Sequence, residues 1–167
     1  MSLRSIAASA FTPGRGVVDA VRALCDQIYR DYEFDAEFSD VSTPLGEVLD
    51  ARRGVCQDFA HLAVGALRAV GLAARYVSGY LETVPPPGRP RLVGADASHA
   101  WASVWTPQAG WVDFDPTNGH LPVNDHVTVA WGRDYADVIP VRGVMIGPAA
   151  DQRLEVAVDV ERVSAGI

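Results

Sequence analysis

The chain has 167 residues, 49% of them hydrophobic, and its 21 acidic side chains outnumber 14 basic ones, which gives a formal net charge of -7. This acidic balance, with no basic run beyond pairs, argues against nucleic acid or an anionic membrane as a partner. No apolar run reaches the roughly 18 to 20 residues of a membrane-spanning helix, and two cysteines are too few for a disulfide framework. We therefore expect one globular domain with free thiols in the cytoplasm.

The first half of the chain is predicted to be helical. Residues 1–12 carry no clear pattern, and the domain is expected to cover residues 13–163. Beyond residue 12, apolar residues recur at steps of three and four, which indicates helices with one buried face. Cys25 lies beside the first stripe and is interpreted as a small core residue. The predicted helices span 13–32, 43–54 (capped by Thr43 and ended by Gly54) and 55–71.

The second half is predicted to form strands. A strand is expected from Ala73 to Glu82, followed by a proline-rich loop, Thr83 to Ala97, that is a candidate lid or groove rim, with an ordinary surface loop as the equal alternative. The alternating run "SHAWASVW" and the following "GWVDFDPT" predict a hairpin. Helices followed by an antiparallel sheet define an α+β fold. Further strands are expected at 126–131, 141–146 and 154–163.

Cys56 lies in the first turn of the third predicted helix, within "RRGVCQDFAHLAVGALRAVG". A thiol at this place lies against unpaired backbone N–H groups and the positive end of the helix dipole, which favours a thiolate. The same N–H groups can stabilise an oxyanion. The position suits a nucleophile, although a small thiol beside an apolar stripe is more often a packing residue.

A cysteine nucleophile works best with an imidazole that a third group orients. His99 begins the alternating strand of the hairpin, and the second strand brings Asp113 and Asp115 back towards it. We predict that Trp105 pairs with Trp111. In that register His99 and Asp115 lie diagonally on one face, whereas a shift by one residue would separate them. Asp115 is therefore the predicted partner of His99, since Asp113 lies nearer the turn.

The other histidines are weaker candidates. His61 follows Cys56 by five positions on the same helix, which turns it roughly 140° away, so it cannot be the base. Asp58 and His61 are predicted to form a structural hydrogen-bonding pair. His120 and His126 lie in a polar loop and near a strand start, where a solvated or loop-pairing histidine is expected.

The tryptophans of the hairpin share the predicted face of His99. Trp101 and Trp111 are candidates for the wall of a substrate groove, although aromatic residues at strand spacing are more often core residues. The segment "WGRDYADV", Trp131 to Val138, combines Trp, Arg, Asp and Tyr, but no chemical role follows from it.

The blocks "GVCQDFAHLAVGALRAVGLAARYVSGYL", "DASHAWASVW" and "GWVDFDPTNG" resemble the three signature blocks of the transglutaminase-like superfamily. They are closely similar to those of bacterial members often described as candidate cysteine proteases. The similarity runs from about Pro13 to Glu161 and implies a papain-like α+β core. By this match Cys56 is the nucleophile, His99 the general base and acid, and Asp115 the partner of the histidine. Bacterial relatives usually carry a β-rich region before this core, so the chain is expected to be a fragment or a minimal member.

The resemblance implies acyl transfer on an amide or peptide carbonyl through a thioester. By analogy with the bacterial members, hydrolysis by a cysteine protease or amidase is favoured over crosslinking by a protein-glutamine transglutaminase. The expected partner is a peptide or protein amide substrate. No cofactor is expected, and a zinc site built from Cys56, His99 and Asp115 is disfavoured because the chain lacks a CxxC pair. A partner-binding module without activity is the remaining alternative.

Overall fold

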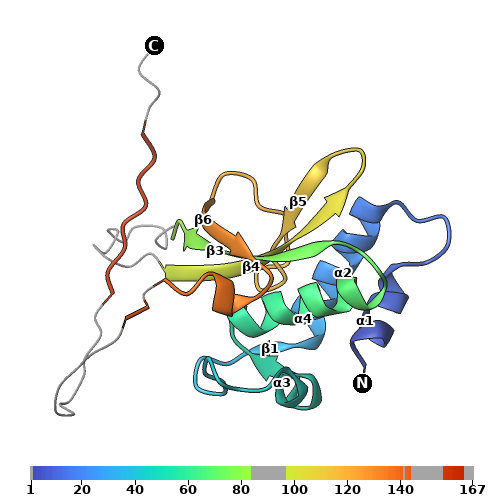
Figure 1. Ribbon diagram of the computed structural model, residues 1–167, viewed down its shortest axis with the longest axis horizontal. Helices are drawn as coiled ribbons and strands as arrows, with labels where there is room; N and C mark the ends of the chain where they lie inside the picture. The colour runs from blue at the N-terminus through green and yellow to red at the C-terminus, as the bar shows by residue number, and fades with distance from the viewer. Residues whose placement is uncertain (1, 84–96, 141, 144–155, 164–167) are drawn as a thin grey trace.

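Helices of the first half of the chain cover one face of a four-stranded sheet in the computed structural model, which describes residues 2–83, 97–140, 142–143 and 156–163 (Figure 1). The α+β class predicted from the sequence is confirmed. The elements in chain order are α1 Leu3–Ala10, α2 Val17–Asp31, β1 Glu33–Phe34, α3 Leu45–Ala51, β2 Arg53–Gly54, α4 Cys56–Ala69, β3 Ala74–Leu81, β4 Ala97–Thr106, β5 Gly110–Phe114, β6 His126–Gly132 and the 3-10 turn η1 Tyr135–Asp137.

The sheet is antiparallel and has the strand order β5-β4-β3-β6. Trp105 pairs with Trp111, so the predicted register of the hairpin is confirmed. On the other side of β4, His99 lies opposite Gly79 of β3. A Cβ on Gly79 would lie 2.0 Å from the carbonyl oxygen of Val127, so this glycine lets β6 approach β3 closely. The strands thus bring the start of β6 near the start of β4.

Helix α4 is the centre of the helical layer, because it packs against β4, β3 and α1 (Figure 1). Its apolar stripe is buried as predicted, and Gly71 terminates the helical segment with a φ of +87°. Helix α2 adds a buried stripe that includes Cys25, which is 0% exposed. The main core lies between these helices and one face of the sheet.

Helix α1 occupies the segment in which we predicted no pattern. Ser2 and Ser5 form a reciprocal cap at its start, and Ile6, Ala7 and Ala10 are buried in the main core. The helix has only eight residues, most of them small, so few apolar positions are available to show a period of 3.6 residues. Packing against α4, rather than local propensity, stabilises a helix this short.

Both predicted boundaries of α3 are wrong, and the helix predicted from residue 13 begins at Val17. Pro44, not Thr43, precedes the first residue of α3, and no side chain caps that end. The helix ends at Arg52, which adopts a left-handed backbone with φ 54°, and not at Gly54. Gly54 instead pairs with Phe34 in a short parallel bridge. A Cβ on Gly54 would lie 2.7 Å from a carboxylate oxygen of Asp58, so close packing requires this glycine.

The strand predicted at 126–131 is confirmed as β6, whereas the one predicted at 154–163 is wrong over its described part, 156–163. Only Val158 makes a bridge there, and Val156 is 67% exposed, so the alternation does not face a core. Of the strand predicted at 141–146, the described residues 142–143 are not in a strand, and its other residues, like most of the loop Thr83–Ala97, lie outside the described residues. Of the helices in the described ranges, none is long and apolar enough to cross a membrane.

Candidate active site

Cys56 is the first residue of α4, and a buried carboxylate fixes this first turn. The Val55 N–H donates to Asp58 Oδ2 at 2.8 Å, and the Ser39 hydroxyl donates to the same oxygen. Asp58 is only 4% exposed. The amide of Cys56 has no helical acceptor at this position, so it can face a bound carbonyl oxygen. The Cys56 side chain is half-buried against a small cluster of Ala60, Tyr76, Ala100 and Val138.

His99 lies on β4 between the thiol and a buried carboxylate. Its Nε2 atom is 2.7 Å from Asp115 Oδ2, and the histidine is 8% exposed. Burial alone would lower its pKa, but hydrogen bonds to Asp115 and to the Cys56 side chain, together with their charges, raise the pKa of His99 to about 9. Because Asp115 engages Nε2, Nδ1 is the nitrogen left for the thiol. The structure therefore brings together Cys56, His99 and Asp115, the three residues for which the sequence predicted the roles of nucleophile, base and orienting partner.

The turn "DPTNG" after β5 holds Asp115 by its own backbone. Asp115 Oδ1 accepts the N–H groups of Thr117 and Asn118 at 2.9 and 3.2 Å, and Oδ2 accepts the Asn118 side-chain amide at 2.7 Å. Such a local turn is the usual use of Asp before Pro and Gly. Burial would raise the pKa of Asp115, but the hydrogen bonds from His126, His99 and Asn118 hold it far below the ordinary range. Asp115 is thus a fully ionised carboxylate, 0% exposed.

Helix α2 packs against this turn through Cys25 and Tyr29. The Cys25 thiol donates to the main-chain oxygen of Asp115 at 3.1 Å. A Cβ on Gly119 would lie 2.8 Å from the Tyr29 ring, and Gly119 also has φ +70°, so only glycine fits there. Burial, with the charges of Asp115 and Asp26, raises the pKa of Cys25 to about 12. Cys25 is therefore a structural thiol, as its place beside the stripe predicted.

His126 is the site residue that sequence reasoning missed. Its Nε2 lies 2.8 Å from Asp115 Oδ2, its Nδ1 lies 2.9 Å from Asp125 Oδ1, and its side chain is 2% exposed. We predicted a solvated or loop-pairing role because His126 lies near a strand start. The strand is β6, which pairs with β3 and not with the hairpin, so no spacing in the sequence connects His126 with Asp115. The only local signal is the adjacent Asp125.

Trp101 supports the two histidines and is not open to solvent. It is 0% exposed, and its Nε1–H donates to Asp113 Oδ2 at 3.0 Å. Its ring stacks on His99 with centroids 6.0 Å apart and meets His126 edge-on at 4.9 Å. A fully buried indole cannot form the wall of an open groove, so this part of the groove prediction does not fit the structure.

Trp111 is 40% exposed and lies on the same side of the sheet, farther from His99. The guanidinium of Arg75 lies over its ring at 4.3 Å and over the ring of Trp131 at 4.7 Å. The segment Trp131 to Val138, for which the sequence suggested no role, thus provides one side of this cation–π stack.

His61 does not hydrogen-bond with Asp58 as predicted. Its Nε2 accepts the backbone N–H of Tyr135 at 3.1 Å, and its ring lies 4.7 Å from that of Tyr76. Burial lowers the pKa of His61, which suits a neutral acceptor. The Asp58 carboxylate is instead occupied by Val55 and Ser39.

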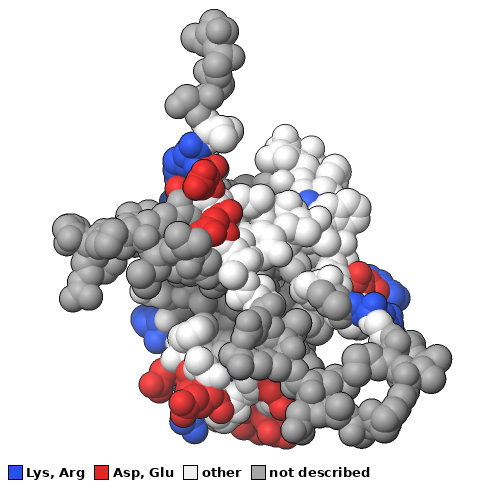
Figure 2. All heavy atoms as spheres, turned by 90° about the vertical axis from the view of Figure 1, so that its left-hand side faces the viewer, with Lys and Arg blue, Asp and Glu red and all other residues white. Residues whose placement is uncertain are grey.

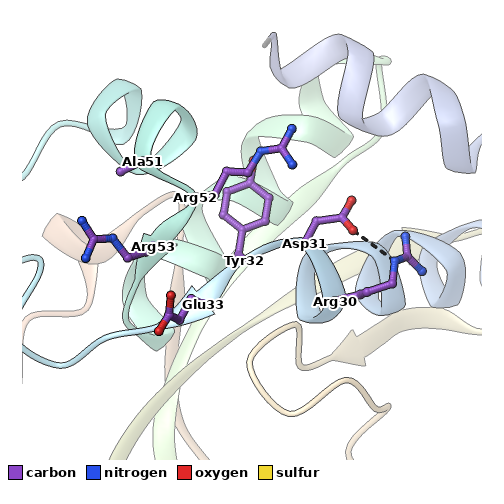
Figure 3. Close-up of a pocket in the computed structure, with 7 residues that line it drawn as sticks. All are labelled: Arg30, Asp31, Tyr32, Glu33, Ala51, Arg52 and Arg53. Atoms are coloured by element: carbon purple, nitrogen blue, oxygen red, sulfur yellow. Dashed lines mark hydrogen bonds and ion pairs between the residues drawn. The ribbon is translucent and has the colours of Figure 1, made fainter.

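A depression of about 530 Å³ at the end of α2 lies apart from the residues described above (Figure 3). Arg30 pairs with Asp31 at 3.0 Å, and Arg53 is 3.4 Å from Asp35. Figure 3 shows the guanidinium groups of Arg30, Arg52 and Arg53 pointing in different directions, so they do not converge on one anion.

A second pocket, of about 480 Å³, lies between β3, β6 and η1. It includes Ser98, the neighbour of His99, and Val138, which belongs to the cluster that Cys56 contacts. Most of the exposed lining is apolar. The pocket therefore shares Val138 with the cluster against which Cys56 packs, although Cys56 itself does not line it.

Three metal-ligand atoms, from His99, Asp115 and His126, lie within 4.8 Å of one another. Both imidazole nitrogens are at hydrogen-bond distance from the carboxylate, 2.7 and 2.8 Å. A zinc ion about 2.0 to 2.2 Å from each atom would require both nitrogens to lose their protons. We therefore interpret the cluster as a hydrogen-bond network.

Comparison with known proteins shows which of them this chain is similar to in sequence and fold. The putative cysteine protease from Cytophaga hutchinsonii has 32% sequence identity and a TM-score of 0.67, with 82% of this chain and 44% of that chain covered. The periplasmic domain of TgpA from Pseudomonas aeruginosa has 26% identity and a TM-score of 0.53, with 70% and 42% covered. The uncharacterized protein Rv2569c of Mycobacterium tuberculosis is 50% identical over 163 residues, 95% of this chain and 52% of that protein.

The chain thus spans about half the length of this mycobacterial relative. A protein-glutamine gamma-glutamyltransferase of Pseudomonas aeruginosa is 39% identical over 71 residues, 42% of this chain and 11% of that protein. The profile of the transglutaminase-like superfamily matches residues 4–116, which include Cys56, His99 and Asp115. Since this match covers more than half of the sequence, the chain belongs to the transglutaminase-like superfamily.

Proposed function

We propose that the chain carries out acyl transfer on amide or peptide carbonyls through a thioester on Cys56. The observation that carries the proposal is the order thiol, His99, Asp115, with His99 bound to a buried, ionised carboxylate on one side and to the thiol on the other. This is the nucleophile, base and orienter arrangement of covalent acyl-transfer enzymes.

The chemistry follows from these positions. The thiol proton moves to His99, and the Cys56 sulfur attacks the carbonyl carbon while the amide of Cys56 stabilises the oxyanion. The imidazolium of His99 then protonates the departing amine, which leaves the acyl group as a thioester. A water molecule gives its proton to His99 and attacks the thioester, which releases the acid and restores the thiol.

Hydrolysis is the favoured outcome, and transfer to an amine is the second candidate. Similarity to the Cytophaga hutchinsonii protein supports hydrolysis, whereas the Pseudomonas aeruginosa gamma-glutamyltransferase supports transfer to an amine. The two reactions share every step up to the thioester, and they differ only in whether water or an amine attacks it.

The test offers a glutamine-containing peptide to the purified chain, with and without a fluorescent amine. Ammonia release that does not depend on the amine indicates hydrolysis, and incorporation of the amine indicates crosslinking chemistry. A library of peptides, read by mass spectrometry, extends the test to peptide-bond cleavage. If no amide is converted, while Cys56 still binds a peptide, the chain is a binding module that lacks activity.

We propose that the apolar pocket, which shares Val138 with the cluster around Cys56, holds an uncharged side chain of the acyl donor. Figure 2 looks onto the end of the sheet where β4 begins, and uncharged residues occupy much of the described surface between the acidic groups. An apolar side chain would gain from burial in this pocket, whereas a charged one would lose hydration.

Filling this pocket tests the assignment. Val129 lines the pocket and is 64% exposed, so the Val129→Trp variant should still fold, and its larger side chain narrows the pocket. For a peptide with an apolar acyl-side residue we expect kcat/KM to fall by roughly tenfold or more. The alkylation rate of Cys56 should not change, because the substitution leaves the thiol intact.

The matched control is Val127→Trp on the same strand, since Val127 is 45% exposed and does not line the pocket. Equal losses in both variants would show that the pocket does not select the substrate.

A further inference from the structure

His126 is a buried titratable group that the mechanism above does not use. Its side chain is 2% exposed, and each ring nitrogen faces a carboxylate oxygen, Asp115 Oδ2 at 2.8 Å and Asp125 Oδ1 at 2.9 Å. A neutral imidazole has only one N–H, so one of these contacts would then set a lone pair against an anion. Only the imidazolium makes both contacts as hydrogen bonds.

The electrostatic surroundings agree with this charge. Burial alone would lower the pKa of His126, but hydrogen bonds to Asp115 and Asp125 and the charges of both raise it above the ordinary value. The neighbouring ring of His120, 5.5 Å away, is itself 3.7 Å from Asp125. Arg162 donates to the main-chain oxygen of Asn124 at 3.4 Å, and its pKa is raised mainly by its pairing with Glu82 and to a smaller extent by the charge of Asp125.

From β4, the titratable group that faces His126 is His99, with ring centroids 5.6 Å apart. Both histidines contact the same carboxylate oxygen, Asp115 Oδ2. A single negative charge therefore supports two cations when His99 is protonated. The charge on His126 holds Asp115 in place and at the same time weakens the support that Asp115 gives to a second imidazolium.

We propose that His126 is a positioning residue that, as an imidazolium between Asp115 and Asp125, sets the pH range in which the pair of Cys56 and His99 reacts. This inference rests on the proposed function, because it concerns the protonation of the same pair. It gives a residue of β6 a role in the site, although β6 lies outside the three sequence blocks that resemble the family.

The test uses His126→Gln and the alkylation of Cys56 by iodoacetamide as a function of pH, quantified by mass spectrometry of the Cys56 peptide. Glutamine can still donate one hydrogen bond to Asp115 but carries no charge. The rate of Cys56 alkylation, plotted against pH, has a low-pH limb and a high-pH limb. Loss of the positive charge of His126 should shift both limbs to higher pH by about one unit. A residue with only a packing role would lower the rate without moving the limbs.

The matched control is His120→Gln, which removes a histidine whose side chain is 43% exposed and whose ring lies 3.7 Å from Asp125. Its profile should coincide with that of the unchanged chain. Unmoved limbs in a folded His126→Gln variant would overturn the proposal.

A second measurement needs no variant. The imidazole resonances of His126, followed by NMR in the unchanged chain, should show the charged form throughout pH 5 to 7, and a neutral ring at pH 6.5 would refute the proposal. The outcomes distinguish a failure of the proposed function from a failure of the role assigned to His126. Slow, ordinary alkylation of Cys56 in the unchanged chain counts against the proposed function, whereas fast alkylation with unmoved limbs counts against His126 alone.

Discussion

Asp115→Asn will lower the rate of amide conversion on the order of 10³-fold and destabilise the fold by about 3 kcal/mol. The rate falls because the asparagine amide cannot hold His99 as an imidazolium in the required orientation. The stability falls because two buried histidines lose the oxygen that both contact, at 2.7 and 2.8 Å. For a chain of this length we expect a decrease in Tm of roughly 6 to 12 °C.

This stability loss depends on pH in a defined direction. The pKa of His99 is raised from 6.5 to about 9, so its contribution is complete below about pH 6.5 and is lost as the pH rises through 9. The pKa of Asp115 is lowered from 3.8, so its contribution is present above that value and is lost in stronger acid. The difference in Tm between the unchanged chain and Asp115→Asn should therefore be largest between about pH 4 and 6.5 and shrink towards pH 10.

The control is Asp113→Asn, the same substitution two residues earlier on β5. Asp113 accepts a hydrogen bond from the Trp101 indole, whereas the carboxylate bound to His99 is that of Asp115. We expect a loss below about 1.5 kcal/mol, without a comparable decrease in rate. Thermal unfolding at pH 5, 7 and 9.5 measures the stabilities. An Asp113 variant as inactive as the Asp115 variant would show that Asp115 is not the orienting residue.

Local pattern and register predicted which residues of the candidate site lie together, and the resemblance to a known family supplied the roles proposed for them. Cys56 was placed by the start of an apolar stripe, and His99 was paired with Asp115 because alternation fixes which face each side chain occupies. The sequence "DPTNG" also fixes its own turn, since the Asp115 carboxylate accepts N–H groups two and three residues later. These features depend on residues close in the chain or on one hairpin.

What could not be predicted depends on contacts between distant segments. His126 reaches Asp115 only because β6 crosses to the far edge of β3. Cys25 reaches the main-chain oxygen of Asp115 across 90 positions in the sequence. Helix α1 is stabilised by its contact with α4 and not by its own period. The alternation at 156–163 shows the reverse failure, because alternating apolar residues form a strand only where they pack against a core, and Val156 is 67% exposed.

The two cysteines will differ in their reaction with iodoacetamide. An ordinary thiol with a pKa near 8.5 loses about tenfold in rate for each pH unit below that value, because only the thiolate reacts. If His99 holds the Cys56 sulfur as a thiolate, its rate will fall by less than about tenfold between pH 7 and pH 5. Cys25 will not react in the folded chain, since it is 0% exposed and burial raises its pKa to about 12.

Removing the imidazole of His99 should give Cys56 the pH dependence of an ordinary thiol. In His99→Ala, we expect the alkylation rate of Cys56 to decrease about tenfold for each pH unit again. Between pH 7 and pH 5 this amounts to a loss of roughly a hundredfold or more in rate. Cys56→Ala should abolish amide conversion altogether, because no other thiol is accessible: Cys25 is the only other cysteine in the sequence and is fully buried.

The matched control for the histidine is His120→Ala, whose side chain is 43% exposed and which should leave the profile unchanged. Unfolding in urea provides the internal reference, since both thiols then react at the rate of an ordinary cysteine. Equal and slow rates for Cys56 and Cys25 in the folded chain would contradict the nucleophile assignment. A flat profile that persists in His99→Ala would instead show that the first turn of α4, and not the imidazole, stabilises the thiolate.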